Sequence, residues 1–146
     1  MSALVVSIDA SVWAAAQLAS EVGRGVARRL IGAVLRSGAR IEQPTLTLVE
    51  LPSALRRRGT DPSQIQRHVA RLAGVREGTF HDLDLRAAID AAGAAIGTGL
   101  RTGDAVYLAT ARQAGATLIT FDQELLAAKV PGVRVMTPEA WLAAYG

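Results

Sequence analysis

The sequence contains no cysteine, one lysine, two histidines and few aromatic residues. Without cysteine, the chain can form neither disulfides nor thiolate metal sites. Aromatic residues make up 4% and hydrophobic residues 50%, so a core must be mainly aliphatic. No apolar run approaches the roughly 18 residues that a membrane-spanning helix needs, and no basic stretch typical of a signal peptide opens the chain. We therefore expect a cytoplasmic protein that does not associate with membranes.

Positive charge is carried almost entirely by arginine. Lys and Arg number 16, all of them arginine except Lys129, and the net charge is +3. Arginine binds phosphate through paired hydrogen bonds, and the isoelectric point near 10.2 is typical of nucleic-acid binders. A GC-rich genome would also favour arginine codons over lysine codons, so the ratio alone does not indicate function. The basic isoelectric point holds under either explanation.

Strand-like and helix-like segments alternate along the 146 residues, which fit one compact domain spanning residues 1–146. Short apolar runs predict strands at 4–8, 40–43, 78–81, 118–121 and 133–136. Helical spacing predicts helices at 11–23, 25–37, 45–58, 62–72, 85–95, 105–113 and 138–144. Pro52 is expected to interrupt the 45–58 helix. Gly97-Thr98-Gly99 is expected to end the 85–95 helix before the 105–113 helix begins. The alternation predicts an α/β fold, a single-domain α/β/α sandwich with a central parallel sheet.

Four acidic residues stand where strands end or helices begin. Asp9 and Asp122 each directly follow a predicted strand. Glu50 lies early in a helix that follows a strand, and Asp104 opens a helix that leads into one. Strand ends and these helix starts meet at the same edge of a parallel sheet. Four carboxylates there would repel one another, and no cationic partner is evident, so we expect a hard divalent cation among them.

Each acid also has a structural alternative. Asp9 and Asp122 both fit the N-cap of a helix, and Asp104 would complement a helix dipole. Glu50 stands on an otherwise apolar helix face, where an unpaired carboxylate would be costly. The joint pattern favours one shared site over four independent structural roles.

The residues around these acids resemble the PIN domain, above all its small single-domain branch, the VapC-type toxins of toxin–antitoxin pairs. The matching segments are Asp9-Ala10-Ser11-Val12, Glu50 in a helix, Gly103-Asp104-Ala105-Val106-Tyr107-Leu108-Ala109 and Leu118-Ile119-Thr120-Phe121-Asp122. The resemblance spans nearly the whole chain and implies a PIN-like, Rossmann-like fold. It also implies that Asp9, Glu50, Asp104 and Asp122 are catalytic metal ligands, supported by the hydroxyls of Ser11 and Thr120.

The same resemblance implies an endoribonuclease, a hydrolase in which Mg²⁺ or Mn²⁺ activates water to cut RNA phosphodiester bonds. The implied partners are RNA, a cognate antitoxin protein and a second copy of the chain in a homodimer. Three alternatives stay open: a housekeeping RNA-processing nuclease of the PIN type, a haloacid-dehalogenase-like phosphatase, and a non-catalytic RNA-binding module. The phosphatase would need an Asp where Ser11 stands.

Two further segments are candidates for contacts with partners. Arg56, Arg57 and Arg58 end the Glu50 helix, where they fit either RNA phosphates or complementation of the helix dipole. The 11–38 region carries more small and aliphatic residues than one helix pair needs. Unless all of it packs into the core, part is expected to offer a groove to an amphipathic antitoxin helix. His68 and His81 are expected to be surface or packing residues.

Overall fold

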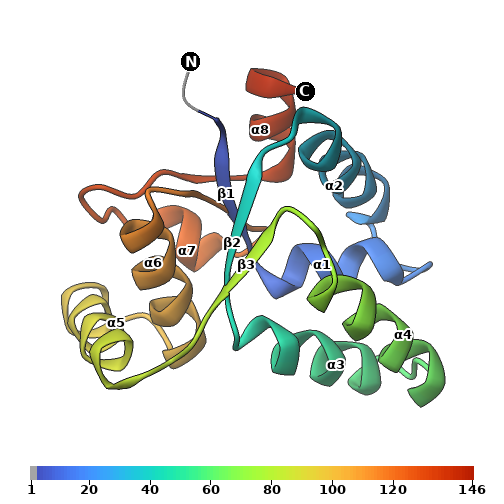
Figure 1. Ribbon diagram of the computed structural model, residues 1–146, viewed down its shortest axis with the longest axis horizontal. Coiled ribbons are helices and arrows are strands. Elements are labelled where there is room, and N and C mark those ends of the chain that lie inside the picture. Colours follow the sequence, from blue (N-terminus) through green and yellow to red (C-terminus); the bar gives the residue numbers. More distant parts are fainter. Residues whose placement is uncertain (1–2) are drawn as a thin grey trace.

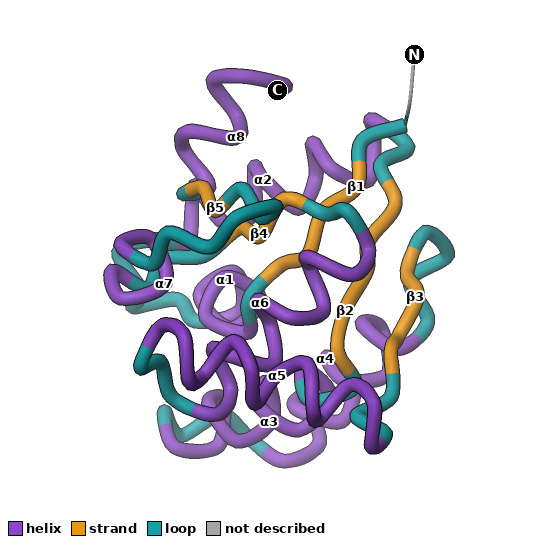
Figure 2. The backbone as a smooth tube through the Cα atoms, turned by 90° about the vertical axis from the view of Figure 1, so that its left-hand side faces the viewer, coloured by secondary structure: helices purple, strands orange, loops and turns teal. Residues whose placement is uncertain are grey.

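The computed structural model describes residues 3–146, and its centre is a five-stranded sheet with helices on both faces (Figure 1). All of its neighbouring strands pair in parallel, and their order is β3-β2-β1-β4-β5, which Figure 2 shows from the side. The strands are β1 Val5–Ile8, β2 Arg40–Pro44, β3 Gly78–His81, β4 Thr117–Ile119 and β5 Val135–Met136. The predicted α/β/α sandwich with a parallel sheet is confirmed.

The helices form a layer on each side of the sheet. Their bounds are α1 Ala10–Gln17, α2 Arg24–Ser37, α3 Thr47–Arg57, α4 Pro62–Ala73, α5 Leu85–Thr98, α6 Thr102–Ala114, α7 Gln123–Ala127 and α8 Pro138–Tyr145. Helices α1 to α4 and α8 cover one face, and α5, α6 and α7 lie on the other (Figure 1). Within residues 3–146, no helix combines the length and the apolar character needed to cross a membrane.

The helix starts follow the local chemistry of the sequence. The side chains of Asp61, Asp84 and Thr137 each accept a hydrogen bond from a backbone N–H in the first turn of the helix that they precede, at 3.0, 2.9 and 3.1 Å. Such caps satisfy N–H groups that have no partner inside the helix. Gly38 ends α2 in a left-handed conformation with φ of 69°, which glycine adopts without steric cost.

The first helix is shorter than the sequence predicts. It ends at Gln17, where Leu18 turns to an extended conformation, and turns fill the segment before α2. Gly23 in this segment packs closely against the ring of Phe121: a Cβ added at Gly23 would lie 2.9 Å from a ring carbon. A helix extended through 18–23 is therefore wrong.

The expected break at Pro52 is also wrong. Pro52 lies inside α3, which continues to Arg57. A proline removes one backbone hydrogen bond from a helix, but Leu51 and Leu55, exposed by 2% and 0%, anchor α3 in the core on either side of it.

Helix α5 continues past the predicted end at residue 95. The hydroxyl of Thr98 donates to the Ala94 carbonyl at 2.7 Å, and the helix ends only at Gly99, whose φ is 73°. Gly97 is therefore helical, and the break before α6 is shorter than expected.

Candidate functional site

Asp9, Glu50, Asp104 and Asp122 line one open pocket of about 560 Å³ at the carboxyl edge of the sheet. Asp9 directly follows β1, and Asp122 comes shortly after β4 at the start of α7. Glu50 and Asp104 lie in the first turns of α3 and α6. The structure thus brings together the four acids that were inferred from the alternation of strands and helices. The pocket is also lined by Ala10, Ser11, Val49, Ser53, Ala54, Arg57, Arg101 and Gly103.

Asp9 occupies the N-cap position of α1, but its side chain does not cap the helix. Instead, its Oδ2 accepts hydrogen bonds from Ser11 Oγ and Thr120 Oγ1, both at 2.8 Å. Thr120 Oγ1 in turn accepts the backbone N–H of Asp122 at 3.0 Å, which couples the ends of β1 and β4. The two hydroxyls therefore orient Asp9 and leave its Oδ1 as the oxygen available to a ligand.

Asp122 does act as a helix cap. Its Oδ1 accepts the backbone N–H groups of Glu124 and Leu125 at 2.8 and 3.1 Å. The capping alternative is thus correct for Asp122 and wrong for the side chain of Asp9. Because the cap uses one carboxylate oxygen, it holds the side chain still while Oδ2 stays outside these bonds.

Glu50 lies directly against the start of α6. A Cβ on Gly103 would be 2.6 Å from Glu50 Oε1, closer than nonbonded atoms approach. Glycine at this position therefore allows the Glu50 carboxylate to reach the first turn that carries Asp104. The sequence interpretation used Gly103 only as part of the family segment and missed this contact.

Burial and the charges of neighbouring acids raise the pKa of Asp9, Glu50 and Asp104. Burial, followed by the charges of Asp9 and Asp104, raises the pKa of Glu50 to about 7. Burial, followed by the charges of Asp122, Asp9 and Glu124, raises the pKa of Asp104 to about 6. Burial also raises the pKa of Asp9, although the hydrogen bonds from Thr120 and Ser11 oppose it. The ionised pocket is therefore under electrostatic strain that a bound cation would relieve.

Glu42 on β2 provides a comparison, because it is a buried carboxylate paired with two basic side chains. It pairs with His81 at 2.5 Å and with Arg40 at 2.8 Å. Burial alone would raise the pKa of Glu42, but these two partners outweigh it and hold the pKa below its ordinary value. Sequence reasoning missed Glu42, and His81 proves to be its partner. In the described part of the chain, none of the four pocket acids has such an ion pair.

Two arginines nevertheless stand at the pocket. Arg57 and Arg101 both line it, and Arg101 lowers the pKa of Asp104, although less than burial and the neighbouring acids raise it. No cationic partner was evident in the sequence, but the structure places these two arginines at the rim of the pocket. The three arginines at the end of α3 therefore lie in different surroundings. Arg58 lines a neighbouring cavity and pairs with Glu21 at 2.7 Å, whereas Arg56 is exposed and lines neither that cavity nor the acidic pocket. Arg101 opens α6 and was missed.

The donor set of the pocket suits a hard divalent ion, since it offers carboxylate and hydroxyl oxygens and no sulfur or imidazole. In residues 3–146, however, no group of three or more Asp, Glu or His side chains is already arranged around one ion position. One oxygen of Asp9 and one of Asp122 are engaged in protein hydrogen bonds. The donors therefore fit such an ion in chemistry, and binding would require side chains to reorient.

The PIN domain model matches residues 6–131 of this chain. The chain belongs to the PIN domain family. That match removes the haloacid-dehalogenase alternative, which rests on a different family. A comparison with curated protein sequences finds no significant match.

Solved structures share the fold at low sequence identity. VapC20 of Mycobacterium tuberculosis, described as a sarcin–ricin loop cleaving toxin, is 21% identical with a TM-score of 0.72, covering 88% of this chain and 98% of its own. PAE2754 of Pyrobaculum aerophilum is 24% identical with a TM-score of 0.70, covering 99% and 98%. A toxin–antitoxin complex from Klebsiella pneumoniae contains a chain that is 22% identical with a TM-score of 0.67, covering 91% and 97%. At these identities the likeness concerns the fold.

Proposed function

We propose that this PIN domain protein is a metal-dependent endoribonuclease and the toxin of a toxin–antitoxin pair. The main support for this proposal is the pocket that Asp9, Glu50, Asp104 and Asp122 line together. The pKa values of Asp9, Glu50 and Asp104 are raised there. Membership of the PIN domain family supports a nuclease. The fold shared with a toxin that cleaves the sarcin–ricin loop supports RNA as the substrate.

Asp9, Glu50, Asp104 and Asp122 would hold one or two Mg²⁺ or Mn²⁺ ions. A divalent ion there would lower the pKa of an attacking water and neutralise charge on the phosphodiester. Ser11 and Thr120 orient Asp9 through its Oδ2, and the α7 cap orients Asp122. Glu50 and Asp104, with pKa values of about 7 and 6, would lose their protons to solvent when a cation binds, because ligand carboxylates must be ionised.

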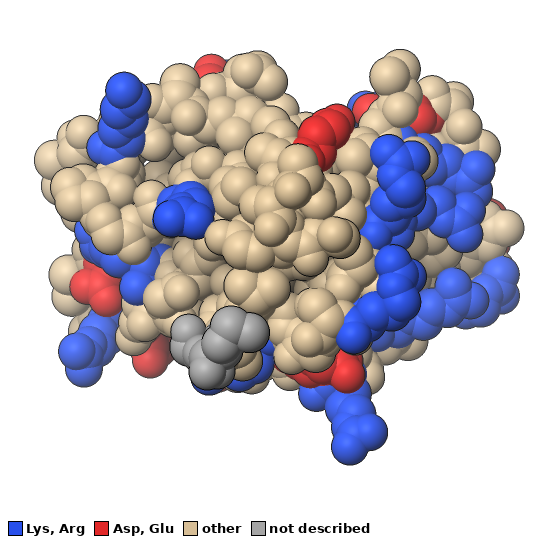
Figure 3. Space-filling model, turned by 90° about the horizontal axis from the view of Figure 1, so that it is seen from above, with Lys and Arg blue, Asp and Glu red and all other residues tan. Residues whose placement is uncertain are grey.

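Arg57 and Arg101 would bring the RNA backbone to the carboxylates. They line the pocket from α3 and from the start of α6, and a polyanion needs positive charge there because the acids repel it. Arginine side chains also gather on the side of the molecule that carries α2, seen on the right of Figure 3. Arg28, Arg29 and Arg36 of α2 are exposed. This surface would attract RNA generally, whereas the rim arginines would hold phosphates at the site.

Changing Arg57 and Arg101 together to Gln should weaken RNA binding and flatten its salt dependence. Each lost contact to a single strand reduces the slope of log K against log salt by about 0.7, so the pair should reduce it by about 1.4. Binding is measured by fluorescence anisotropy in EDTA, so that the RNA stays uncut. The matched control changes Arg56 and Arg86, both exposed and outside the pocket, to Gln. Equal slopes of log K against log salt in the two double variants would contradict the proposal that Arg57 and Arg101 contact RNA phosphates.

The antitoxin would bind a second cavity that adjoins the acidic pocket. This cavity has a volume of about 500 Å³ and shares Ser11 and Ala54 with the pocket. Its lining includes Ala14, Leu18, Val22 and Val26 from the predicted 11–38 region. A cavity whose aliphatic lining is bordered by the charged Glu21, Arg58 and Glu139 suits an amphipathic helix, and its position would let a partner reach the acids.

Expression of this chain alone should arrest bacterial growth, and co-expression with the small protein encoded beside it should restore growth and give a stable complex. Val22→Asp should weaken capture in a pull-down, because Val22 lines the cavity and is fully exposed. Leu35→Asp, exposed on α2 outside this cavity, serves as the control. RNA cleavage without growth arrest or complex formation would instead favour a housekeeping nuclease.

A homodimer would use the outer face of α5. Leu85, Ile89 and Ile96 are exposed there by 78%, 62% and 87%, beside an apolar cavity of about 310 Å³ between α5 and α6. Exposed large apolar side chains that share one helix face commonly mark an interface. We expect light scattering to give twice the chain mass for the wild type and a single chain mass for Ile89→Asp. A wild type that stays monomeric at high concentration would contradict this assembly.

A further inference from the structure

We propose that Gln43, Thr47 and Tyr107 are positioning residues, which join into one buried hydrogen-bonded network that holds the pocket carboxylates in place and thereby strengthens cation binding. The inference rests on the proposed metal-dependent function. None of the three residues lines the acidic pocket, so they would act through the backbone and helices that carry the acids.

The network begins where β1 and β2 separate. The β1–β2 ladder pairs Val5 with Arg40 and Val6 with Ile41. Further along, the side chain of Gln43 takes the place of a backbone partner for Ile8. Its Oε1 accepts the Ile8 N–H at 2.6 Å, and its Nε2 donates to the Ile8 carbonyl at 2.8 Å. The residue held in this way directly precedes Asp9.

From Gln43 the network continues to the two helices that carry the other acids. Gln43 Nε2 also donates to Thr47 Oγ1 at 3.0 Å, and Thr47 Oγ1 lies 2.8 Å from the hydroxyl of Tyr107. Burial raises the pKa of Tyr107, and the backbone of Ala10, which faces the Tyr107 hydroxyl, opposes this rise. The network thus links the backbone just before Asp9 to the helices α3 and α6.

The spacing along the helices links these polar residues to the acids. Thr47 stands three positions before Glu50 on α3, and Tyr107 stands three positions after Asp104 on α6. Residues three apart share one face of a helix. Fixing Thr47 and Tyr107 against each other therefore fixes the helix faces that present Glu50 and Asp104, and Gln43 ties them to the backbone of Ile8, which directly precedes Asp9.

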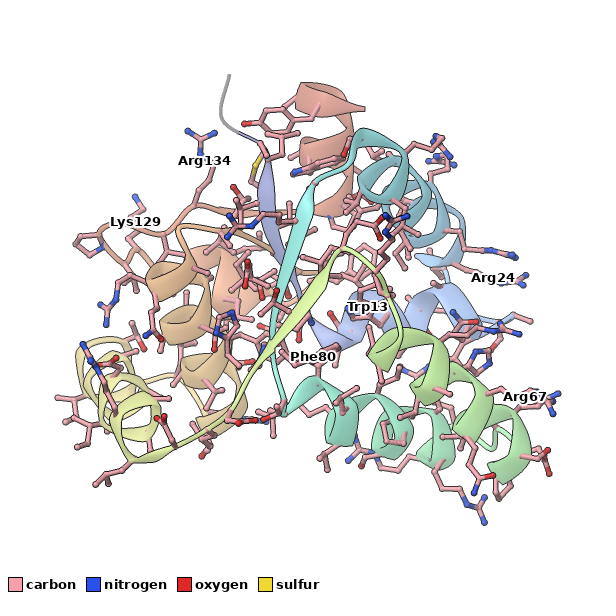
Figure 4. The ribbon with its side chains drawn as sticks, viewed as in Figure 1. Trp13, Arg24, Arg67, Phe80, Lys129 and Arg134 are labelled. Carbon is pink, nitrogen blue, oxygen red and sulfur yellow. The ribbon has the colours of Figure 1, made fainter. Side chains whose placement is uncertain are left out.

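The network is fully buried, and each of its side-chain polar atoms has a hydrogen-bond partner. Gln43, Thr47 and Tyr107 are each 0% exposed. Trp13, labelled among the central elements in Figure 4, donates a further bond from its indole N–H to the Ile8 carbonyl at 3.1 Å. Satisfied buried networks are rigid, and rigidity is needed here because the ionised carboxylates repel one another. A loosened network would let them move apart and weaken their hold on an ion.

The test separates the hydroxyl of Thr47 from its methyl group. Thr47→Val keeps the shape but removes the hydroxyl, whereas Thr47→Ser keeps the hydroxyl. Calorimetric titration of the full chain with Mn²⁺ should give a dissociation constant about tenfold weaker for Thr47→Val and close to wild type for Thr47→Ser. The melting temperature in EDTA measures stability separately. A lower melting temperature for Thr47→Ser would not bear on the inference, which concerns Mn²⁺ binding.

Tyr107→Phe supplies an independent variant, because it removes only the hydroxyl that bonds to Thr47. We expect the same weakening of Mn²⁺ binding as for Thr47→Val. Ser7→Ala is the matched control: Ser7 lies on β1 and is 0% exposed, but its hydroxyl has no hydrogen-bond partner. Its loss should leave Mn²⁺ binding unchanged.

If Thr47→Val and Tyr107→Phe both bind Mn²⁺ as tightly as the wild type, the inference about the network is overturned. The proposed metal-dependent function would still stand, and the network would have only a stabilising role. Weakening in Ser7→Ala equal to that in Tyr107→Phe would also overturn the inference. Failure of the wild type itself to bind Mn²⁺ would overturn the proposed metal-dependent function, and the inference with it.

Discussion

Asp104→Asn should abolish RNA cleavage, with a loss of at least about 100-fold, because it removes a charged metal ligand from the pocket. The same change should leave the metal-free protein as stable as wild type or more so. Burial and the neighbouring acids raise the pKa of Asp104 to about 6, so its ionised form opposes folding. Removing that charge should raise the melting temperature in EDTA by roughly 1–4 °C.

The measurement pairs a cleavage assay on a structured RNA in Mg²⁺ with thermal unfolding in EDTA. Asp82→Asn is the matched control, since Asp82 is an exposed aspartate outside the pocket. It should leave both cleavage and stability unchanged. A clear fall in the metal-free melting temperature of Asp104→Asn would mean that the carboxylate mainly supports the start of α6, against the proposed ligand role.

Chelation should have an equally large effect: RNA cleavage should stop in excess EDTA and return when Mg²⁺ or Mn²⁺ is added beyond the chelator. The bound ion should also stabilise the fold. At a free ion concentration about 100 times the dissociation constant, binding contributes about 2.7 kcal/mol. For a domain of this size, that should raise the melting temperature by roughly 5–12 °C. Cleavage that persists unchanged in EDTA would contradict the metal mechanism.

The stabilisation by Mn²⁺ should depend on pH. The pKa values of Glu50 and Asp104 rise from 4.5 to about 7 and from 3.8 to about 6 on folding. An acid whose pKa is raised on folding binds its proton more tightly in the folded state. The stability of the metal-free protein should therefore fall between about pH 4 and pH 7, as these two groups ionise. The Mn²⁺-induced rise in melting temperature should therefore be larger at pH 7.5 than at pH 5.5, where the ion must displace protons. An equal rise at both pH values would contradict ligation by these carboxylates.

The order of elements was sufficient to predict which residues meet. Asp9 and Asp122 follow parallel strands, and Glu50 and Asp104 begin helices, so a parallel sheet brings all four to one edge whatever the details of packing. The fold class followed from the same alternation, because strands separated by helices pair in parallel. Errors arose where a local rule met tertiary packing. Pro52 stays helical because the core holds Leu51 and Leu55, and α1 ends early where Leu18 adopts an extended conformation.

The tertiary structure alone decided how each side chain is used. Asp9 and Asp122 look alike in the sequence as helix caps, yet only Asp122 caps, because the hydroxyl of Thr120, directly after β4, bonds to the Asp9 side chain. The bonds of Gln43 to Ile8 and of Thr47 to Tyr107 join residues far apart in the chain. Periodicity reports which face of a single element is buried, whereas a hydrogen bond between elements depends on how those faces pack together. The sequence by itself therefore determined where the acids gather, and the packing of β1, α3 and α6 determined how they are held.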